Sequence, residues 1–482
     1  MLTDRRIGAP RLVALLGAWR RDGAAYGALA DALRAAILSG AVPLRTTLPG
    51  ERELADALAV SRTTTASAYD VLRTEGYLVS RRGSGTVTTL PARAAGRPRA
   101  DTTPADEDVL DLSIAAPPAP TRLHAAYLAA LDALPRHLAT TGYTPLGVPE
   151  LREAIADRYT RRGTPTTPDQ VLVTTGAQHA IHLLLAAHCG PGDRVVVEHP
   201  TYPRAIDAAR AAGGRPVPVP VHADGLDLDL LDSTVRQVSP RVAYLIPDHH
   251  NPTGTSLSAE ARDRVRALAR RTRTLVVADE ALTDLTLDGP PPAPLTGDGR
   301  DAGLVVTVGS ASKSFWGGLR IGWVRADPEL VARLAAERSH VDLGTPVLEQ
   351  LVAARLLLDG ADALDERRAF LRSQRELLRG LLAERLPDWR FAVPPGGLAL
   401  WVDLGAPVSS AVVALCARLG LRLAAGPAFG VDGSFERYLR LPYTADDDAL
   451  GRAVAILADA WTAVARTPPS TADARLPYAA VV

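Results

Sequence analysis

The sequence predicts a multidomain protein with a small helical module and two-stranded wing, a large α/β domain, and a smaller α+β C-terminal subdomain. Short helical periods ended by turn signals fill residues 11–88. Residues 91–108, PARAAGRPRADTTPADED, lack apolar periodicity, which predicts a linker. From residue 109, strand-like apolar runs alternate with amphipathic helices, the pattern of a doubly wound sheet. The expected division is a module over 1–90, a linker over 91–108, a large domain over 109–466 and a tail over 467–482.

The bulk composition fits a globular protein. The chain has 482 residues, of which 47% are apolar and 22% charged, and this length suits roughly three domains. It contains no uninterrupted apolar run of about 18 residues, so we expect no membrane-spanning helix. The apolar stretch Leu12–Trp19 is short, is followed by Arg20 and Arg21, and lacks the features of a signal peptide. We therefore expect an amphipathic helix there.

Charge and cysteine content restrict the possible partners. The formal net charge is zero, so DNA binding would require a local basic patch, such as the one near the N-terminus. Cys189 and Cys416 are far apart in the sequence and lack metal-binding spacing. We therefore expect no metal site, and we expect the reducing environment of the cytoplasm.

Two residue types occur only once each. The single Lys is Lys313 and the single Asn is Asn251, while Arg supplies nearly all of the basic charge. Because this chain uses Arg wherever a cation is sufficient, its one Lys is expected to do what Arg cannot. That role is to lose a proton and attack a carbonyl carbon. The alternative is an accident of codon usage.

Three helical periods make up the N-terminal module. The first ends near Gly40, the second follows Pro49, and Ser61 offers a hydroxyl cap to the third. Two short helices joined by a tight turn, the later one with a polar start, form the helix-turn-helix pattern. The inward-facing residues expected on the three helices are Leu29, Leu33, Ile37, Leu54, Leu58, Thr65, Ala68, Tyr69 and Leu72.

The third helix and the segment after it carry residues suited to DNA. Arg62, Thr63 and Thr64 lie at the helix start, where Arg can contact guanine in bidentate fashion in the major groove. The segment YLVSRRGSGTVTT then alternates around a Gly-Ser-Gly tip, which predicts a wing with Arg81 and Arg82 near the phosphates. A small helical bundle that binds no DNA would give a similar pattern, so the pattern alone leaves both alternatives open.

The motifs of this module resemble those of the GntR family of regulators. ILSG, LPGERELADALAVSRTT, AYDVLRTEGY and SRRGSGT stand at the family's spacings. The resemblance implies a winged helix-turn-helix that binds a double-stranded DNA operator. Ala66 replaces an Arg that several family members have, so we expect a different operator sequence. The DNA contacts implied by the resemblance are Arg52, Ser61, Arg62, Thr63 and Gly83, and the helix start and wing add Thr64 and Arg82.

The densest chemical signal is GSASKSFWGGLRIGW, residues 309–323. A Lys that forms a Schiff base with a phosphate-bearing cofactor needs hydroxyl groups and a cation nearby to hold the phosphate. Ser310, Ser312 and Arg320 supply these groups, and the guanidinium of Arg320 suits a phosphate. The alternative is an ordinary turn between strands.

Further polar residues stand at the ends of predicted strands. Gly176, Ala177 and Gln178 lie at a strand-to-helix junction, where free backbone N–H groups form an anion site. Asn251 follows the strand VAYLIP, and Asp279 ends the strand LVVADE, where an α/β ligand would lie. A carboxylate there keeps a pyridine nitrogen protonated. The alternative for Asp279 is a helix N-cap.

Together these pieces resemble a fold-type-I aminotransferase that uses pyridoxal 5′-phosphate. YTPLGVPELREAI, GAQ, EHPTYP, HNPTG, DE, SASK, RIG and LRLPY appear in the family's order. The resemblance implies that Lys313 forms the Schiff base, Asp279 holds the pyridine nitrogen, and Asn251 bonds the phenolic oxygen. It implies that Tyr202 stacks on the ring and that Arg440, with Arg204 as a possible second clamp, binds an amino-acid carboxylate. The phosphate ligands it implies are Ser310, Arg320, Ala177, Gln178 and, from the partner subunit, Tyr143.

A GntR-type module joined by a linker to such a domain resembles the MocR-type subgroup of regulators. This implies a head-to-tail homodimer whose DNA binding responds to the cofactor, an amino acid or an amine. Ala281 and Leu282 stand where the family's enzymes usually have a Tyr that bonds the phenolic oxygen, which favours a sensor over an enzyme. Two alternatives remain, namely an active aminotransferase and a DNA-binding protein with an empty scaffold.

Overall fold

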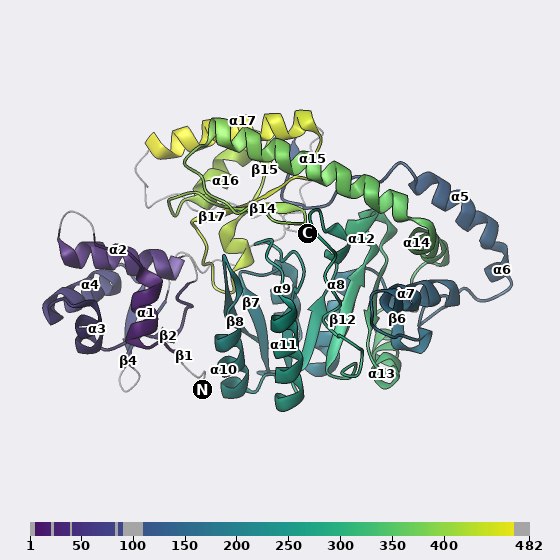
Figure 1. Ribbon diagram of the computed structural model, residues 1–482, viewed down its shortest axis with the longest axis horizontal. Coiled ribbons are helices and arrows are strands. Elements are labelled where there is room, and N and C mark those ends of the chain that lie inside the picture. Colours follow the sequence, from purple (N-terminus) through teal and green to yellow (C-terminus); the bar gives the residue numbers. More distant parts are fainter. Residues whose placement is uncertain (1–4, 21–23, 39–40, 82–84, 90–108, 467–482) are drawn as a thin grey trace.

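The computed structural model describes residues 5–20, 24–38, 41–81, 85–89 and 109–466. The expected linker 91–108 and tail 467–482 lie outside these ranges, as do Gly40, Arg82 and Gly83. Figure 1 shows a small N-terminal module beside a larger body, which consists of a central sheet with helices on its faces and a second layer of strands and long helices.

The N-terminal module confirms the predicted helices and wing. All nine inward-facing residues expected from the sequence are buried, and the Oγ of Ser61 accepts a hydrogen bond from the backbone N–H of Thr64 at 3.1 Å. The amphipathic segment expected near Leu12 is also helical, with Leu12 and Leu16 buried. The sequence analysis missed the short parallel pairing of β1 with β2, which extends the wing to a sheet in the order β1-β2-β4-β3. The elements are β1 (Arg5–Arg6), α1 (Ala9–Leu16), α2 (Ala25–Leu38), β2 (Thr46–Thr47), α3 (Glu51–Leu58), α4 (Arg62–Thr74), β3 (Leu78–Arg81) and β4 (Gly85–Thr88).

The larger body begins with the predicted alternation of strands and helices. Its elements up to the end of the central sheet are β5 (Leu110–Asp111), α5 (Leu123–Ala133), α6 (Pro135–Leu138), α7 (Pro149–Arg161), η2 (Pro168–Gln170), β6 (Val171–Thr174), α8 (Ala177–His188), β7 (Arg194–His199), α9 (Pro203–Ala211), β8 (Arg215–His222), β9 (Gly225–Leu226), α10 (Leu228–Val238), β10 (Val242–Leu245), α11 (Ala259–Thr272), β11 (Leu275–Asp279), η3 (Thr283–Leu285), β12 (Val305–Ser310), α12 (Ala311–Ser314), η4 (Gly317–Leu319) and β13 (Gly322–Arg325).

The central sheet is doubly wound, as predicted. Within the described residues it has eight strands in the order β6-β13-β12-β11-β10-β7-β8-β9, and β13 runs antiparallel to both of its neighbours. Side chains alternate between the two faces. Val195 and Val197 of β7 pack with α8 and α9 on one face, while Val196 packs with α10 and α11 on the other. Because both faces are covered by helices, the middle residues of the central strands are mostly apolar.

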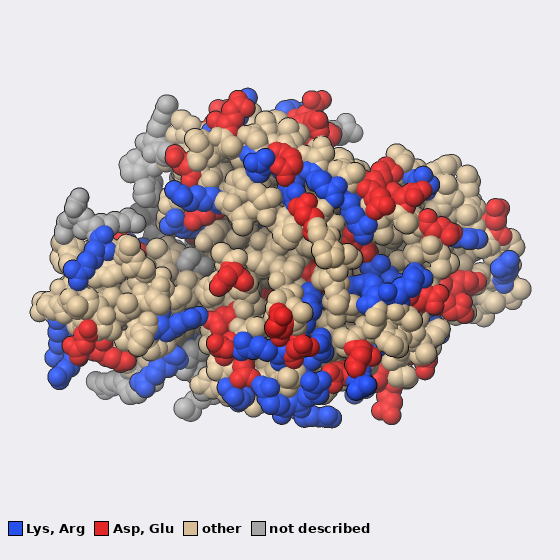
Figure 2. Space-filling model, viewed as in Figure 1, with Lys and Arg blue, Asp and Glu red and all other residues tan. Residues whose placement is uncertain are grey.

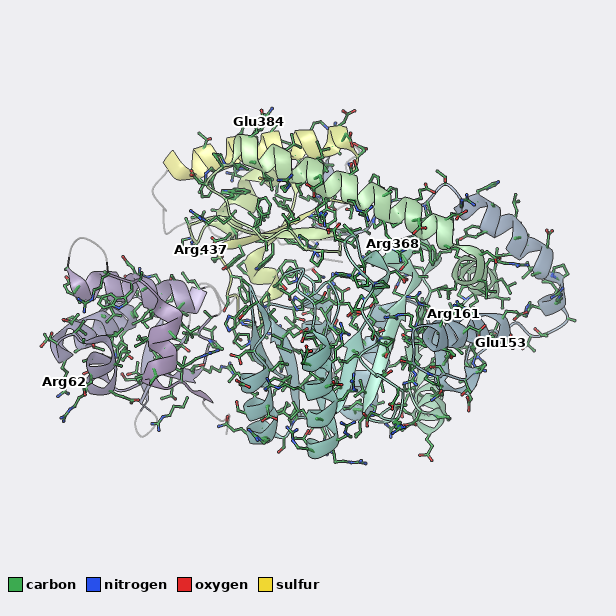
Figure 3. All side chains as sticks on the ribbon, viewed as in Figure 1. Arg62, Glu153, Arg161, Arg368, Glu384 and Arg437 are labelled. Carbon is green, nitrogen blue, oxygen red and sulfur yellow. The ribbon has the colours of Figure 1, made fainter. Side chains whose placement is uncertain are left out.

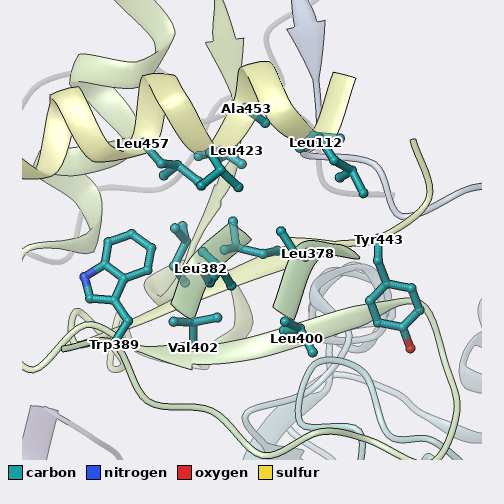
Figure 4. Close-up of a cluster of buried hydrophobic side chains, with 14 of the residues drawn as sticks. Leu112, Leu378, Leu382, Trp389, Leu400, Val402, Leu423, Tyr443, Ala453 and Leu457 are labelled. Atoms are coloured by element: carbon teal, nitrogen blue, oxygen red, sulfur yellow. The ribbon is translucent and has the colours of Figure 1, made fainter. Parts of the chain in front are cut away.

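The C-terminal part confirms the predicted α+β subdomain. The helical residues 347–385 form two helices that meet at Gly360, where an added Cβ would lie 2.1 Å from the carbonyl oxygen of Leu356. Figure 4 shows its core, in which apolar side chains of the long helices α15 and α17 pack over β14. The elements are α13 (Pro328–Arg338), α14 (Val347–Asp359), α15 (Ala361–Arg385), β14 (Ala399–Asp403), α16 (Ser409–Arg418), β15 (Leu421–Arg422), β16 (Ala424–Ala425), η5 (Gly426–Phe429), β17 (Tyr438–Pro442) and α17 (Asp447–Arg466).

Among the described residues, an ion pair and a backbone hydrogen bond join the module to the larger body. The guanidinium of Arg11 on α1 pairs with the carboxylate of Asp227 just before α10. The backbone N–H of Phe435, in the loop between η5 and β17, donates to the carbonyl of Leu38 at the end of α2, with an N to O distance of 2.5 Å. No helix within the described ranges has the length and apolar character needed to cross a membrane.

Candidate functional site

The polar residues predicted at strand ends converge at one edge of the central sheet. Asp279 is the last residue of β11, Asn251 lies in the loop after β10, and Lys313 lies on α12 directly after β12. These three strands are adjacent and parallel, so the segments after them share one edge. This is where ligands bind in open α/β sheets.

A cavity at this edge contains about 730 Å³ of space free of protein atoms, part of which is open solvent. Six of the residues predicted to bind the cofactor line it. The lining residues of the cavity are Ala115, Ala177, Tyr202, Ile246, His249, His250, Asn251, Pro252, Gly254, Asp279, Ala281, Leu282, Ser310, Lys313, Gly396, Gly397, Leu398 and Ala399.

The amine of Lys313 lies in an environment that favours its neutral form. Burial lowers the pKa of Lys313 to about 8, with a further contribution from the positive charges of Arg440 and Arg320, while Asp279 opposes the change. The Nζ atom donates to the carbonyl of Ala115 at 3.0 Å. A neutral amine in contact with a cavity can act as a nucleophile toward a carbonyl carbon.

The carboxylate of Asp279 is held by two donors. Tyr244 on β10 donates its hydroxyl to Oδ2 at 2.6 Å, and the backbone N–H of Ala281 donates to Oδ1 at 3.0 Å. Burial raises the pKa of Asp279, and the hydrogen bonds from Tyr244 and Ala281 oppose that rise. The sequence analysis missed Tyr244. A lone Tyr in the aliphatic strand VAYLIP was the available signal, because a buried phenol needs a partner for its hydroxyl.

Backbone and side-chain donors form an anion cradle between β6 and β13. Gly176 caps α8 with φ of +83°, and an added Cβ there would meet Nη2 of Arg320 at 2.8 Å. Gly322 of β13 has no room for a side chain either, since its Cβ would lie 2.4 Å from the carbonyl carbon of Gly176. Arg320 also donates to the carbonyl of Thr175 at 3.1 Å. The guanidinium of Arg320 therefore lies against the start of α8, where the first backbone N–H groups of a helix have no partners within the helix, and this combination suits an anion.

Unpartnered buried atoms lie beside the cavity. Ser310 lines it and accepts the N–H of Ser312 at 3.1 Å, while the hydroxyl of Ser312 is buried without a hydrogen-bond partner. Oε1 of Gln178 is also buried and unpartnered, although its Nε2 donates to the carbonyl of Arg204 at 3.3 Å. Such buried polar atoms are normally satisfied, so they fit a site that receives a polar ligand.

Tyr202 lines the cavity, and Arg440 lies behind the lining residue Asn251. The guanidinium of Arg440 is fully buried, donates to the carbonyl of Ser113, and lies 3.5 Å from Oδ1 of Asn251. Burial lowers the pKa of Arg440 to about 10, which leaves it charged at neutral pH. Burial and the charge of Asp279 raise the pKa of Tyr202 to about 12, so its hydroxyl is protonated. A buried cation beside the cavity suits a ligand carboxylate.

Two predicted residues lie away from this cluster. Arg204 forms an ion pair with Asp207 one turn along α9 and does not line the cavity. Tyr143 is 66% exposed, so within this chain it does not reach the cavity. Ala281 and Leu282 do line the cavity, so the site has no hydroxyl at these two positions. The described residues include no cluster of three or more His, Cys, Asp or Glu side chains suited to a metal ion.

Five of the predicted DNA-binding residues lie within the described part of the module. Arg52, Ser61, Arg62 and Thr63 are exposed and Thr64 is half-buried, all near the starts of α3 and α4. Figure 3 shows Arg62 at the outer edge of the module, away from the larger body. Figure 2 shows acidic and basic side chains interspersed over the visible face, in keeping with the net charge of zero.

Comparisons with known proteins match both parts of the chain. Residues 107–457 match the family of class I and II aminotransferases, and residues 25–87 match the gntR family of bacterial regulatory proteins. The solved structure of LysN, an α-aminoadipate aminotransferase from Thermus thermophilus complexed with N-(5′-phosphopyridoxyl)-L-leucine, superposes with a TM-score of 0.69. It is 28% identical, and the match covers 77% of this chain and 97% of LysN.

Two curated relatives are named as regulators. PtsJ of Salmonella typhimurium, named as a transcriptional repressor of the vitamin B6 salvage pathway, is 33% identical over 85% of this chain and 92% of its own length. MocR of Rhizobium meliloti, named as a probable regulatory protein of rhizopine catabolism, is 31% identical over 75% of this chain and 78% of its own length. The chain therefore belongs to the class I and II aminotransferase family and, through its gntR-type module, to the MocR-type subgroup of the GntR regulators.

Proposed function

We propose that this protein is a DNA-binding transcription regulator whose larger body binds pyridoxal 5′-phosphate and senses that cofactor, an amino acid or an amine. The observation that carries the proposal is the chain's only Lys, with a pKa lowered to about 8, in a cavity beside Asp279 and within the same chain as a winged helix-turn-helix. Because a regulator of this kind acts on DNA, we expect the protein in the cytoplasm.

The residues around the cavity fit this cofactor. Lys313 supplies the amine, Asp279 the partner for the ring nitrogen, and Asn251 a donor for the phenolic oxygen. Tyr202 supplies an aromatic face for the ring. When bound, pyridoxal phosphate supplies an aldehyde that condenses with amines and a ring that withdraws electrons. The groups that would hold the phosphate are Ser310, Arg320, Ala177 and Gln178.

Effector binding would use charged groups beside the cavity. Arg440 is charged and buried next to Asn251, so it would bind the carboxylate of an amino acid. Arg204 would be a second clamp only if its ion pair with Asp207 opened. Because most of the remaining lining is apolar or glycine, an effector would be held mainly by its carboxylate and amine.

A head-to-tail homodimer accounts for the exposed apolar residues at one end of the body. Leu128 and Leu131 on α5, Leu138 on α6 and Tyr143 are between 47% and 70% exposed. Figure 1 shows α5 and α6 at the end of the body opposite to the module. Such a group marks an interaction surface. We propose that a second copy covers it and that Tyr143 reaches the partner's phosphate site.

Contacts inside the chain support communication between the cavity and the module. Phe435, whose N–H binds the carbonyl at the end of α2, packs against the ring of His199 with a centroid distance of 4.6 Å. Phe429, at the end of η5, accepts the N–H of Thr201 on its backbone carbonyl at 3.0 Å, and Thr201 is the neighbour of Tyr202. The ring centroid of Phe429 also lies 5.0 Å from Cζ of Arg440. A shift of Tyr202 or Arg440 on ligand binding would therefore move this segment and change its hydrogen bond to the end of α2.

An active aminotransferase is the second candidate, favoured by relatives such as the 2-aminoadipate transaminase of Thermus thermophilus, 32% identical over 65% of this chain. Ala281 and Leu282 argue against efficient turnover because they supply no donor for the phenolic oxygen. Steady production of a keto acid by the purified protein would favour the enzyme.

A gel-shift scan of the DNA flanking the protein's own gene, with and without pyridoxal phosphate and candidate amino acids, tests the regulator. We expect a specific band whose affinity changes with ligand. Arg62→Ala should weaken specific binding about tenfold or more. Arg300→Ala, which changes an exposed Arg in a loop of the larger body, is the matched control and should bind as the parent does. Equal binding of the parent and Arg62→Ala would refute the assigned DNA surface.

Absorbance tests the cofactor half of the proposal. The parent protein should acquire a visible band on addition of pyridoxal phosphate, and Lys313→Ala should not. A colourless parent protein would refute cofactor binding whatever the DNA experiment shows.

A further inference from the structure

Asp279 is supported by a tyrosine to which none of the roles above is assigned. Tyr244 lies in the middle of the central sheet, on β10, and is 1% exposed. Its hydroxyl donates to Oδ2 of Asp279 at 2.6 Å. Burial, followed by the charge and hydrogen bond of Asp279, raises the pKa of Tyr244 well above its usual value, so the phenol keeps its proton.

The strand register explains why this tyrosine reaches this carboxylate. Tyr244 pairs directly with Val277 on the neighbouring parallel strand β11. Val277 and Asp279 are two residues apart, so their side chains project from the same face of the sheet. The ring of Tyr244 packs in the same apolar cluster as Val277. An aromatic side chain is long enough to reach the diagonal neighbour on the next strand, which here is Asp279.

The hydrogen-bond inventory of the pair leaves a position for one more donor. A phenol has a single hydrogen, and Tyr244 gives it to Oδ2, while Ala281 gives its N–H to Oδ1. An ionised carboxylate accepts at both oxygens and has further lone pairs. The two donors therefore fix the plane of the Asp279 carboxylate and stabilise its charged form although the group is buried. The remaining lone pairs of the carboxylate oxygens can still accept a hydrogen bond from a ligand in the cavity.

We propose that Tyr244 is a positioning residue for Asp279, whose hydroxyl keeps the carboxylate oriented and ionised so that it can pair with the protonated ring nitrogen of pyridoxal phosphate. The proposal rests on the proposed function, because it requires that cofactor in the cavity. Without the hydroxyl, the carboxylate becomes more basic and competes for the ring proton. A ring that has lost positive charge withdraws fewer electrons, so the Lys313 nitrogen bonded to the cofactor should keep its own proton to higher pH.

The test compares the parent, Tyr244→Phe, Asp279→Asn and the double variant by titrating pyridoxal phosphate and by following the visible band against pH. Tyr244→Phe should bind the cofactor roughly tenfold more weakly. The pH at which its band changes should rise by about one unit. In the Asp279→Asn background the same change should have little further effect, because the carboxylate that Tyr244 orients is already absent. Tyr159→Phe is the control, since it also removes a buried hydroxyl, one that accepts from Trp323 at 3.2 Å.

The outcomes separate the two proposals. A parent protein without a visible band refutes the proposed function. A parent with a band, together with a Tyr244→Phe variant that has the parent's affinity and pH profile, refutes the role of Tyr244. So does a Tyr244→Phe shift that persists fully in the Asp279→Asn background. If Tyr244→Phe does not fold, 3-fluorotyrosine at position 244 alone keeps the ring and makes the hydroxyl a stronger donor. The band should then change at lower pH, and an unchanged pH would overturn the proposal.

Discussion

The depressed pKa of Lys313 gives a quantitative prediction about cofactor capture. Its pKa falls from the usual 10.5 to about 8 because the amine is buried and faces the charges of Arg440 and Arg320. At pH 7 the neutral fraction is then about 10%, compared with about 0.03% for an ordinary Lys. Only the neutral amine attacks the aldehyde, so at this pH the protein makes roughly 300-fold more of the reactive form available.

The assay is rapid mixing of cofactor-free protein with pyridoxal phosphate from about pH 6 to about pH 11, following the visible absorbance. The capture rate should rise with pH and level off above about 8, the pKa of Lys313. Arg440→Gln removes one of the positive charges that lower this pKa, so its midpoint should move to higher pH. Lys313→Ala gives the background. A parent midpoint near 10.5 would refute the argument that the cavity activates this amine.

Three further predictions concern stability. Ser61→Ala removes the cap that accepts the N–H of Thr64 and should lower the free energy of unfolding of the module by about 1 kcal/mol, measured by urea denaturation. Leu29→Ala removes a side chain that is 0% exposed in the module core and should cost about 2 to 5 kcal/mol, whereas Leu419→Ala, at an exposed position outside the proposed dimer surface, should cost little. Burial lowers the pKa of His249 from 6.5 to about 4, so between these values the unfolded chain binds more protons. Stability should fall as the pH falls through this window, by up to about 3 kcal/mol, and urea titrations of His249→Gln should lack this loss.

Much of the fold could be predicted because local sequence patterns indicate its helices and strands. The period of apolar residues defined the helices of the module, and the Ser61 cap was predicted from the residue type at a helix start. The alternation of apolar strands and helices defined the doubly wound sheet. The antiparallel strand β13 was not predicted, because a buried apolar strand has the same pattern in either direction.

The site residues that are unusual in type or in position could also be predicted from the sequence. Lys313 and Asn251 are the only residues of their kinds, and Asp279 is an acidic residue at the end of an apolar strand. Their meeting in one cavity follows from the rule that parallel strands end at the same edge of a sheet. The sequence alone thus identified three groups that the fold brings together in one cavity.

Only the tertiary structure decided which neighbours adjust those groups. Tyr244 and Asp279 are far apart in the sequence, and their contact depends on the pairing of Tyr244 with Val277. The pKa of Lys313 depends on burial and on Arg440, a charge contributed by the distant strand β17. The physical reason is that hydrogen-bond partners, burial and electrostatic interactions depend on distances in space, which strand register and layer packing set and local sequence patterns do not encode.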